Sequence, residues 1–410
     1  MKSQTITNAL LIISVIVFIF GSGFKMGQYS NRLGAGSSAA NVDSKAKNLD
    51  FSMFWDVWGK LQEKYVDKKK LDTNKMYFGA IKGMVASIED PYTFFLTPSE
   101  NKQSKDDLGG KFEGIGAQLG LKEKQVVIVA PLKNSPAEKA GLKAGDVVTK
   151  VNNESIKDLP LPQVVNKIRG EKGTKVTITI ERNGQSQNFT MTRDEIKVSS
   201  VELTYDKATT CDSCLPAADI KINQFGENTN DEWTKAVEEV SQKWQKKEIS
   251  GLVLDLRDNP GGYLESAVYI ASEFIPQDKL IVKQESTVTP SHDYYSMRDG
   301  KLLDIPVSVL INQGSASASE ILSGALRDYK RATLIGEKSF GKGSVQEALD
   351  LGNGAGLHVT VAKWLLPKGD WINGKGIQPD VTVKNELKEG NTLTKENDQQ
   401  LETALENIIK

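Results

Sequence analysis

Two stretches of the chain repeat one hydrophobic pattern, in which a short apolar run is followed by a glycine-containing turn and then by apolar residues at helical spacing. The first leads from the run at 251–256 to a helix expected at 264–274, and the second leads from the run at 307–311 to a helix ending at 328–331. A nearly continuous apolar run is typical of a strand buried on both faces. If the two strands are parallel neighbours, both turns lie at the carboxyl edge of one sheet, where α/β folds build their sites.

Further elements are predicted on either side of these stretches. N-terminal residues 48–103 are predicted to be helical, because apolar side chains recur at three-to-four spacing, as from Phe51 to Leu61. We interpret these helices as covering a core or pairing with another subunit, and a polar terminal helix as serving packing or assembly. The remaining elements expected in the second half are a strand at 218–225, a helix at 231–246, a strand at 354–364 and the terminal helix at 392–410.

Residues 111–196 have a different pattern. Five short β-type runs are separated by glycine turns, with a short helix expected from Ser135 and a longer one at 161–169. This pattern predicts a separate β-rich domain.

The N-terminal end carries a membrane-insertion signal. Residues 9–20 are almost wholly apolar, and no charge lies between Lys2 and Lys25. About 20 apolar residues span a bilayer, whereas a shorter apolar core suits a secretory signal peptide, so length alone leaves both alternatives open. No clear cleavage site follows, and we expect an uncleaved anchor with the body of the protein outside the cytoplasm. Cleavage and export is the alternative.

Composition limits the classes of function. The 410 residues carry 52 basic and 53 acidic side chains, so no overall positive field attracts nucleic acid. Cys211 and Cys214 form a lone C-x-x-C pair without the nearby histidines or second pair of a metal site. We expect a small disulfide, which an exported location permits, rather than a metal or redox site.

The two turns carry the candidate chemistry. A serine nucleophile needs a base and donors for the oxyanion, and the second turn offers Ser315, Ser317 and Ser319. The chain has only two histidines, His292 and His358, and neither sits in a turn or motif that suggests catalysis. A Ser-His-Asp triad is therefore not expected, although distance along the sequence does not exclude one.

A buried lysine is the alternative base, because burial disfavours its charged form. Lys342 lies between Gly341 and Gly343 beside Phe340, and Gln346 follows four residues later on the same face, where its amide oxygen would hold the lysine amine. The same segment, from Gly336, matches the first seven positions of a phosphate-binding loop. Gly343 replaces the hydroxyl residue of that motif, which argues against nucleotide binding.

Two resemblances make these expectations specific. SPAEKAGLKAGDVVTKVNNESI at 135–156 resembles the centre of a PDZ domain, and EGIGA at 113–117 resembles its carboxylate-binding loop. In such a loop successive backbone N–H groups converge on a peptide's terminal carboxylate, and the peptide adds as a strand to a sheet edge. The resemblance implies peptide binding by Glu113, Gly114, Ile115, Gly116 and Ala117. The alternative is a β-rich domain whose glycines only form turns.

DLRDNPGG at 255–262, GSASASEI at 314–321 and GEKSFGKGSVQ at 336–346 resemble the carboxyl-terminal processing (tail-specific) peptidases. The resemblance also covers EDPYT at 89–93 and GIQPD at 376–380. It implies Ser317 as the nucleophile, Lys342 as its base and Gln346 as the supporting amide. It implies oxyanion donors at the N–H groups of Ala318 and Gly262, with Gly261 as the close alternative.

The family implies an α/β peptidase core with crotonase-like and Clp-protease-like layers, an inserted β-rich PDZ domain, and N- and C-terminal helices. The expected domains are a membrane anchor or signal segment at 1–25, a flexible linker at 26–47, an N-terminal helical region at 48–108, the PDZ domain at 109–197, the serine peptidase core at 198–385 and a helical tail at 386–410.

The function expected is that of a serine endopeptidase that cleaves proteins near their C-termini. The expected partners are proteins or peptides with exposed C-terminal tails, the membrane through the N-terminal anchor, and a second copy of the chain through the terminal helices. No nucleic acid, metal or cofactor is expected. Arg169 is a candidate for coupling the PDZ domain to the active site, or else a solvated loop charge. The alternative function is a catalytically inert PDZ-containing binding scaffold.

Overall fold

A computed structural model describes residues 49–409, apart from 123–124, 133, 144, 158, 160 and 386–392. The chain divides into two compact units, one ending at Tyr77 and the other beginning at Phe78, within helix α4 (Thr73–Ala86). The expected anchor and linker lie outside the described residues. In the described part of the chain, no helix combines the length and the apolar content that crossing a membrane requires.

The first unit contains helix α3 (Ser52–Lys64) and the short helix η2 (Lys68–Lys70). The rings of Phe54, Trp55 and Trp58 contact one another along α3, with centroids 5.0–6.2 Å apart. No residue of α3 is buried. The expected helix is therefore present, but the described chain does not cover its apolar face, and pairing with another subunit stays a prediction.

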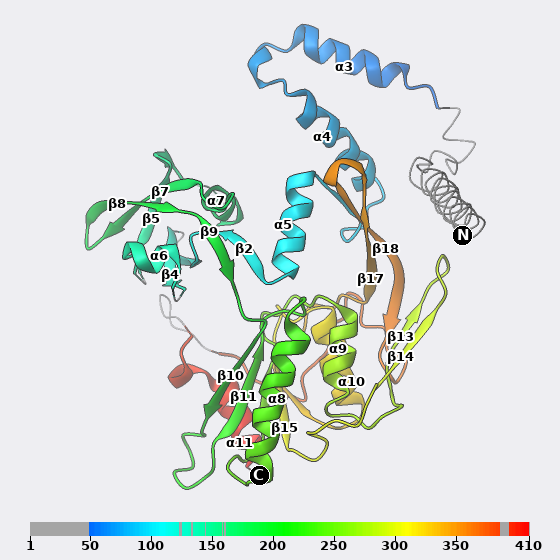
Figure 1. The fold of residues 1–410 in the computed structure, drawn as a ribbon. Helices are drawn as coiled ribbons and strands as arrows, with labels where there is room; N and C mark the ends of the chain where they lie inside the picture. Colours follow the sequence, from blue (N-terminus) through cyan, green and yellow to red (C-terminus); the bar gives the residue numbers. More distant parts are fainter. Residues whose placement is uncertain are drawn as a thin grey trace, which may run out of the picture. The chain divides into compact units, whose positions relative to one another are not determined.

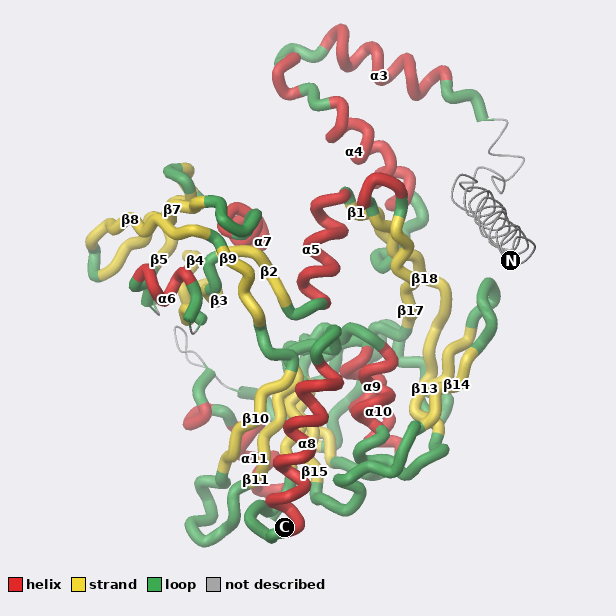
Figure 2. Tube along the Cα trace, in the orientation of Figure 1, coloured by secondary structure: helices red, strands yellow, loops and turns green. Residues whose placement is uncertain are grey.

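A six-stranded sheet forms the centre of the second unit (Figures 1 and 2). The strands β12 (Leu252–Asp255) and β15 (Val307–Ile311) are parallel neighbours, with Asp255 opposite Leu310. The two apolar runs therefore meet the condition of parallel neighbours set in the sequence analysis, and both of the following turns lie at one edge of the sheet. The order is β10 (Val201–Asp206), β11 (Ala217–Ile222), β12, β15, β16 (Thr333–Gly336) and β19 (Val381–Thr382), and only β10 runs antiparallel to its neighbour.

Helices cover both faces of this sheet. Alternate residues of β12 point to opposite sides, so that Leu252 and Leu254 join the larger apolar core and Val253 joins the smaller one. The larger core includes side chains of α8 (Thr229–Gln245), α9 (Leu264–Ala271) and α10 (Ala318–Asp328). The smaller core lies under the C-terminal helix α11 (Gln399–Ile408), which follows the short helix η4 (Lys395–Asn397). The terminal helix therefore packs against the sheet, which is one of the two roles expected for it.

A second sheet is antiparallel. Its longest strand, β18 (Gly356–Leu365), follows the short helix η3 (Gly352–Gly354) and pairs with β17 (Ser344–Asp350), β1 (Phe94–Leu96) and β13 (Leu280–Glu285). Strand β14 (His292–Tyr295) pairs with β13. Of the strands in this sheet, the hydrophobic pattern predicted only the β18 segment. Because β17 starts two residues after Lys342, this sheet determines where the candidate base lies.

The β-rich segment forms its own core and sheet. Strands β3 (Ala117–Lys122), β4 (Gln125–Pro131), β5 (Val147–Val151), β7 (Lys175–Arg182) and β8 (Gln185–Thr192) pair in that order, and β6 (Glu154–Ser155) pairs with β5. Helix α6 (Pro136–Ala140) begins at Ser135, whose hydroxyl accepts a hydrogen bond from Glu138 N. Helix α7 (Leu161–Ile168) packs against β3 and buries Val164 and Ile168 in this core. The two helices predicted between the strands are therefore present.

A two-stranded ribbon connects this segment to the rest of the chain. Strand β2 (Lys111–Gly114) enters and β9 (Asp194–Lys197) leaves, and the two pair antiparallel with Lys111 opposite Lys197. Helix α5 (Pro98–Leu108) precedes the ribbon and has a capping box formed by Thr97 and Glu100.

The cysteine pair closes a turn between β10 and β11. Cys211 and Cys214 form a disulfide, as expected from their spacing. The same loop contacts helix α11, because Thr209 donates hydrogen bonds from its N–H (2.8 Å) and hydroxyl (2.7 Å) to Glu402 Oε1. Ala208 is buried in the smaller core beside α11. The disulfide therefore restrains a loop that holds the C-terminal helix on the sheet.

Replacing both cysteines with serine should lower the free energy of unfolding by about 2 kcal/mol, because a four-residue loop is then unrestrained in the unfolded chain. Urea denaturation monitored by circular dichroism measures the change. Dithiothreitol should lower the stability of the wild type to that of the double variant and leave the variant itself unchanged. Equal stability of the oxidised wild type and the variant would contradict this role.

Candidate active site

The three serines of the turn after β15 have different environments. Ser315 and Ser319 are fully buried, and their hydroxyls donate hydrogen bonds to the backbone oxygens of Leu256 (2.8 Å) and Asn259 (2.9 Å). Ser317 is only partly buried and lines a cavity of about 320 Å³. Residue types alone do not decide which of the three serines is the nucleophile. In the structure, Ser317 is the one of the three that lines this cavity.

Ser317 has a strained backbone at the start of helix α10. Its φ of 54° and ψ of −115° lie outside the regions that L-residues favour, which costs on the order of 1–3 kcal/mol. The helix that follows leaves the N–H of its first residue, Ala318, without an intrahelical acceptor. Ala318 N donates no hydrogen bond within the described residues, so this N–H is available beside the Ser317 hydroxyl.

The Glu320 carboxylate links this serine turn to the lysine turn. Glu320 is fully buried, and its Oε2 accepts hydrogen bonds from the N–H groups of Ser317 (2.9 Å) and Lys342 (2.9 Å). Its Oε1 accepts from Gly341 N (2.6 Å) and from the Ser339 hydroxyl (2.5 Å). One anion therefore holds the backbones of both candidate catalytic residues. Sequence reasoning did not select Glu320, although the Ser-x-x-Glu spacing of a capping box was a usable signal.

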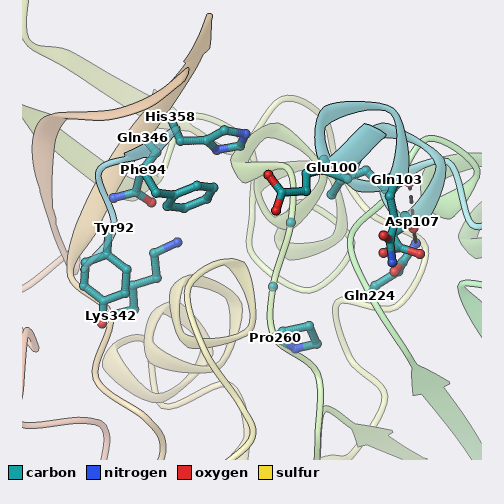
Figure 3. Close-up of a pocket in the computed structure, with 14 residues that line it drawn as sticks. Tyr92, Phe94, Glu100, Gln103, Asp107, Gln224, Pro260, Lys342, Gln346 and His358 are labelled. Atoms are coloured by element: carbon teal, nitrogen blue, oxygen red, sulfur yellow. Dashed lines mark hydrogen bonds between the residues drawn. The ribbon is translucent and has the colours of Figure 1, made fainter. Parts of the chain in front are cut away.

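Lys342 lines the same cavity as Ser317. It also lines a second pocket, shown in Figure 3, together with Tyr92, Gln346 and His358. Burial lowers the pKa of Lys342, against the opposing effect of the Glu320 and Asp90 carboxylates. Its Nζ lies 5.1 Å from the centre of the Tyr92 ring. A lowered pKa increases the fraction of neutral amine, which is the form that can accept a proton.

The two glycines after Pro260 differ in what their N–H groups do. Gly261 N donates to Asn259 Oδ1 (2.9 Å), whereas Gly262 N donates no hydrogen bond within the described residues. Gly262 also lines the cavity that contains Ser317. The arrangement therefore favours Gly262 over Gly261 as a donor to a bound oxygen atom.

Gly261 has a steric role instead. Its φ is +98°, and a Cβ at this position would lie 2.8 Å from Ser317 Cβ and 3.0 Å from Ala318 N. Any larger residue would therefore occupy the space in front of the serine turn.

Gln346 and His358 complete the wall near the lysine. The Gln346 side-chain nitrogen donates to Ser344 Oγ (2.9 Å) and Thr360 Oγ1 (3.1 Å), and no hydrogen bond joins Gln346 to Lys342 in the described structure. His358 lines the same cavity, with its ring stacked on Phe94 at 4.7 Å. Burial and, to a smaller extent, the charge of Lys342 lower the pKa of His358.

His358 was not selected from the sequence, because it lies in the interior of a strand without any motif. Its position opposite Ala348 in the β17–β18 pair is what brings it to the cavity. His292 lies on the edge strand β14, beside Tyr294, and does not line this cavity.

The phosphate-loop alternative does not fit the fold. A phosphate-binding loop leads into a helix whose first N–H groups face the anion. The segment from Gly336 leads instead into strand β17.

The expected peptide-binding residues span the end of β2 and the start of β3. Ile115 is buried in the core of the β-rich domain, and its carbonyl accepts a hydrogen bond from Ala137 N (2.8 Å). Gly116 has a φ of +69°, and a Cβ there would lie 2.4 Å from Ser135 Cβ. Glu113 on β2 forms an ion pair with Lys102 (3.4 Å). Among the described strands, β3 pairs with β4 alone, and helix α7 packs nearby, which is the arrangement that strand addition requires.

Arg169 is not a solvated loop charge. Its Nη1 donates to Asp107 Oδ1 on helix α5 (2.9 Å), and its guanidinium lies 4.9 Å from the centre of the Phe112 ring. Arg169 therefore connects the end of α7 to helix α5.

Comparison with protein families gives three matches. A model of peptidase family S41 matches residues 217–383, a segment that contains both turns. A PDZ-domain model matches residues 127–182, and a model of the N-terminal domain of the activating protease CtpB matches residues 20–99.

Individual relatives agree with these matches. A probable CtpA-like serine protease of Staphylococcus saprophyticus is 42% identical over 333 residues, which are 80% of this chain and 64% of that protein. The chain thus spans slightly less than two thirds of the curated relatives that it matches.

Two solved structures are also similar. A putative S41 protease from Bacteroides fragilis shares the fold at 18% identity, with a TM-score of 0.55 and coverage of 85% of this chain and 95% of that one. A photosystem II D1 C-terminal processing protease is 31% identical, with a TM-score of 0.52 and coverage of 80% of this chain and 86% of that one. This chain covers most of the length of the last relative, and the S41 and PDZ models match two separate segments of this chain. The chain therefore belongs to peptidase family S41, the carboxyl-terminal processing peptidases, and carries a PDZ domain.

Proposed function

We propose that the protein is a serine endopeptidase that cleaves other proteins near their C-termini with a Ser317–Lys342 dyad. The observation that carries this proposal is that Ser317, Lys342, Gln346 and Gly262 line one cavity. In a catalytically inert scaffold, nothing would require a partly exposed strained serine, a lysine of lowered pKa and two unused backbone N–H groups to lie together.

The proposed reaction is acyl transfer. Neutral Lys342 takes the Ser317 proton, and Ser317 Oγ attacks the peptide carbonyl carbon. The N–H groups of Gly262 and Ala318 donate hydrogen bonds to the oxyanion that forms. The Lys342 ammonium then gives its proton to the leaving amine. In the second half of the reaction, neutral Lys342 takes a proton from the water molecule that attacks the acyl-enzyme carbonyl, and it returns this proton to Ser317 Oγ as the acyl group leaves. The buried Glu320 carboxylate holds the serine and lysine backbones in place during these steps.

Ser317→Ala should lower kcat/KM for an unstructured peptide with a free C-terminus by at least about 10⁴-fold, and Lys342→Ala nearly as much, because each removes one partner of the proton transfer. Peptide cleavage followed by mass spectrometry measures both. Ser186→Ala and Lys338→Ala, at exposed positions, are the matched controls. Cleavage by Ser317→Ala at the wild-type rate would favour the inert scaffold.

The pH dependence should identify lysine as the base. The rate depends on neutral Lys342, so kcat/KM rises as the pH increases through the pKa of this lysine. Because burial lowers that pKa, the midpoint of the rise should lie below about pH 10, where an ordinary lysine titrates.

We further propose that the PDZ domain binds the C-terminal tail of the substrate between β3 and α7, with the loop at 113–117 receiving the carboxylate. The edge of β3 that lacks a strand partner among the described residues and the left-handed backbone of Gly116 support this role.

Gly116→Ala should raise KM several-fold for a peptide with a free C-terminus and leave kcat nearly unchanged, because the added Cβ displaces the loop from Ser135. The same peptide with an amidated C-terminus should show no such difference. Gly184→Ala is the matched control, since it also has a positive φ but no atom within 4 Å of its Cβ position. An equal effect of Gly116→Ala on both peptides would argue against tail recognition.

We also propose that the body lies outside the cytoplasm on an N-terminal membrane anchor and pairs with a second copy through its terminal helices. The apolar run at 9–20 supports the membrane anchor, and the Cys211–Cys214 disulfide supports a location outside the cytoplasm. The exposed aromatic residues of α3 support pairing with a second copy.

The full chain should sediment with membranes, and a variant that lacks residues 1–47 should remain in the supernatant and form a dimer. Fractionation with immunoblotting tests the anchor, and sedimentation velocity of the shortened variant tests the dimer. Release of the full chain without detergent would contradict anchoring, and a monomer at micromolar concentration would contradict pairing.

A further inference from the structure

We propose that Asp90 is a positioning residue of this active site, which acts through the Thr360 hydroxyl to fix the orientation of the Gln346 amide and places a negative charge near Lys342. The inference rests on the proposed Ser317–Lys342 reaction and adds to it residues from a different part of the chain.

Strand pairing brings Asp90 to the site. The turn at 90–93 leads directly into β1, which pairs with β18 so that Phe94 lies opposite His358. The Asp90 carboxylate accepts hydrogen bonds from Tyr92 N (3.1 Å) and from the Thr93 hydroxyl (2.7 Å) within the turn. The Thr360 hydroxyl on β18 faces the same carboxylate and helps to lower its pKa. Thr93 Oγ1 also accepts a hydrogen bond from Thr360 N (3.1 Å). The turn is thus fastened to β18 two residues beyond His358.

The Thr360 hydroxyl connects the Asp90 turn to the Gln346 side chain. A hydroxyl has one proton to donate and lone pairs with which to accept. Thr360 Oγ1 accepts a hydrogen bond from the Gln346 side-chain nitrogen (3.1 Å), and the Asp90 carboxylate is the anion toward which we expect the Thr360 hydroxyl proton to point. Because Asp90 is an acceptor, it keeps the hydroxyl proton directed away from Gln346. The lone pair that receives the Gln346 amide is therefore always available.

This arrangement decides which end of the Gln346 amide is free. Its nitrogen donates to the two hydroxyls of Ser344 and Thr360, so both of its N–H groups are used. The amide oxygen accepts no hydrogen bond in the described part of the chain and is the end left for Lys342. A neutral lysine amine needs an acceptor for one N–H while its lone pair faces Ser317. A reversed amide would present a donor to that lone pair and compete with the serine proton.

The charges around Lys342 give Asp90 a second role. Lys342 is faced by Glu320 from α10 and by Asp90 and Tyr92 from the 90–93 turn, with His358 on β18. Burial opposes ionisation of Asp90, but the hydrogen bonds from Thr360, Thr93 and Tyr92 and the charge of Lys342 keep its pKa below the usual range. Asp90 is therefore an anion at neutral pH. It stabilises the lysine ammonium that forms when Ser317 loses its proton.

Substitutions of Thr360 test the orienting role. Thr360→Val removes the hydroxyl at nearly constant volume and should lower kcat about 10- to 100-fold with little change in KM, because a misplaced base costs this much. Thr360→Ser keeps the hydroxyl and should restore most of kcat. Thr204→Val is the matched control, since Thr204 donates to Asp206 (3.0 Å) in an exposed position outside the cavity. Wild-type kcat in Thr360→Val, or equal losses in the valine and serine variants, would overturn the proposal.

Asp90→Asn tests the charge separately. Asparagine keeps an acceptor oxygen and removes the negative charge, so the lysine ammonium loses stabilisation and the pKa of Lys342 falls. The acid limb of the pH profile of kcat/KM should therefore move to lower pH, by about half a unit or more. Thr360→Val retains the Asp90 charge and should move this limb less. An unchanged limb in Asp90→Asn would overturn the electrostatic part.

A readout without turnover distinguishes failure of this inference from failure of the proposed reaction. The pH dependence of Lys342 acetylation by acetic anhydride, measured by peptide mass spectrometry, reports the pKa of the amine directly. The measurement uses the Ser317→Ala background with and without Asp90→Asn, and the melting temperature of each variant confirms folding. A lower midpoint with Asp90→Asn supports the inference even where no substrate is cleaved, and an unchanged midpoint overturns it. Undiminished cleavage by Ser317→Ala, in contrast, overturns the proposed reaction alone.

Discussion

The buried Glu320 carboxylate is the interaction on which the geometry of the site depends. An anion removed from water is costly unless hydrogen bonds replace its hydration, and Glu320 receives four of them. Three come from backbone N–H groups, which do not vary with side-chain identity. The serine turn and the lysine turn come from different strands, so this one carboxylate sets their relative position. The strained backbone of Ser317 is kept in place by the same contacts.

A second constraint is the close approach of two turns on adjacent parallel strands. β12 and β15 end side by side, and Gly261 then lies against Ser317 with no space for a side chain. The Asn259 side chain completes the arrangement, because Oδ1 accepts from Gly261 N and Nδ2 donates to Ile222 O. The neighbouring Gly262 is left with an unused N–H. The sheet therefore creates one donor of the proposed oxyanion site and helix α10 creates the other.

Much of this arrangement was predictable from local patterns and motifs. The apolar run at 251–256 and the run at 307–311 predicted two buried strands. Their parallel pairing was only a condition at that point, and the structure supplies it. Residue types alone did not choose among Ser315, Ser317 and Ser319. The three serines differ in whether the hydroxyl donates a hydrogen bond to a backbone carbonyl, and the sequence does not show this. The family resemblance, not the pattern, selected Ser317, whereas Lys342 was already the candidate base from its place between two glycines.

The surroundings of the lysine were less predictable. Asp90, Thr360 and His358 reach it through pairing of β18 with β1 and β17, and β1 precedes the other two strands by more than 240 residues in the chain. Short strands such as β1 have no periodicity to read, and the register of an antiparallel pair depends on tertiary packing. Gln346 was placed on the correct face by its spacing. The use of both its N–H groups by hydroxyls depends on partners that spacing does not reveal.

The ribbon of β2 and β9 has a consequence for how this protein can diversify. The chain leaves the catalytic body and returns to it at adjacent points, where Val198 N donates a hydrogen bond to Gly110 O (2.9 Å). An inserted domain whose two ends lie close together does not distort the domain that contains it, because the two attachment points remain near each other. Recombination at these two positions would exchange the PDZ domain as a unit and leave the peptidase domain intact. On the proposed role of the PDZ domain in tail recognition, new substrate ranges are accessible through replacement of one domain, without the many coordinated substitutions that reshaping a cleft demands.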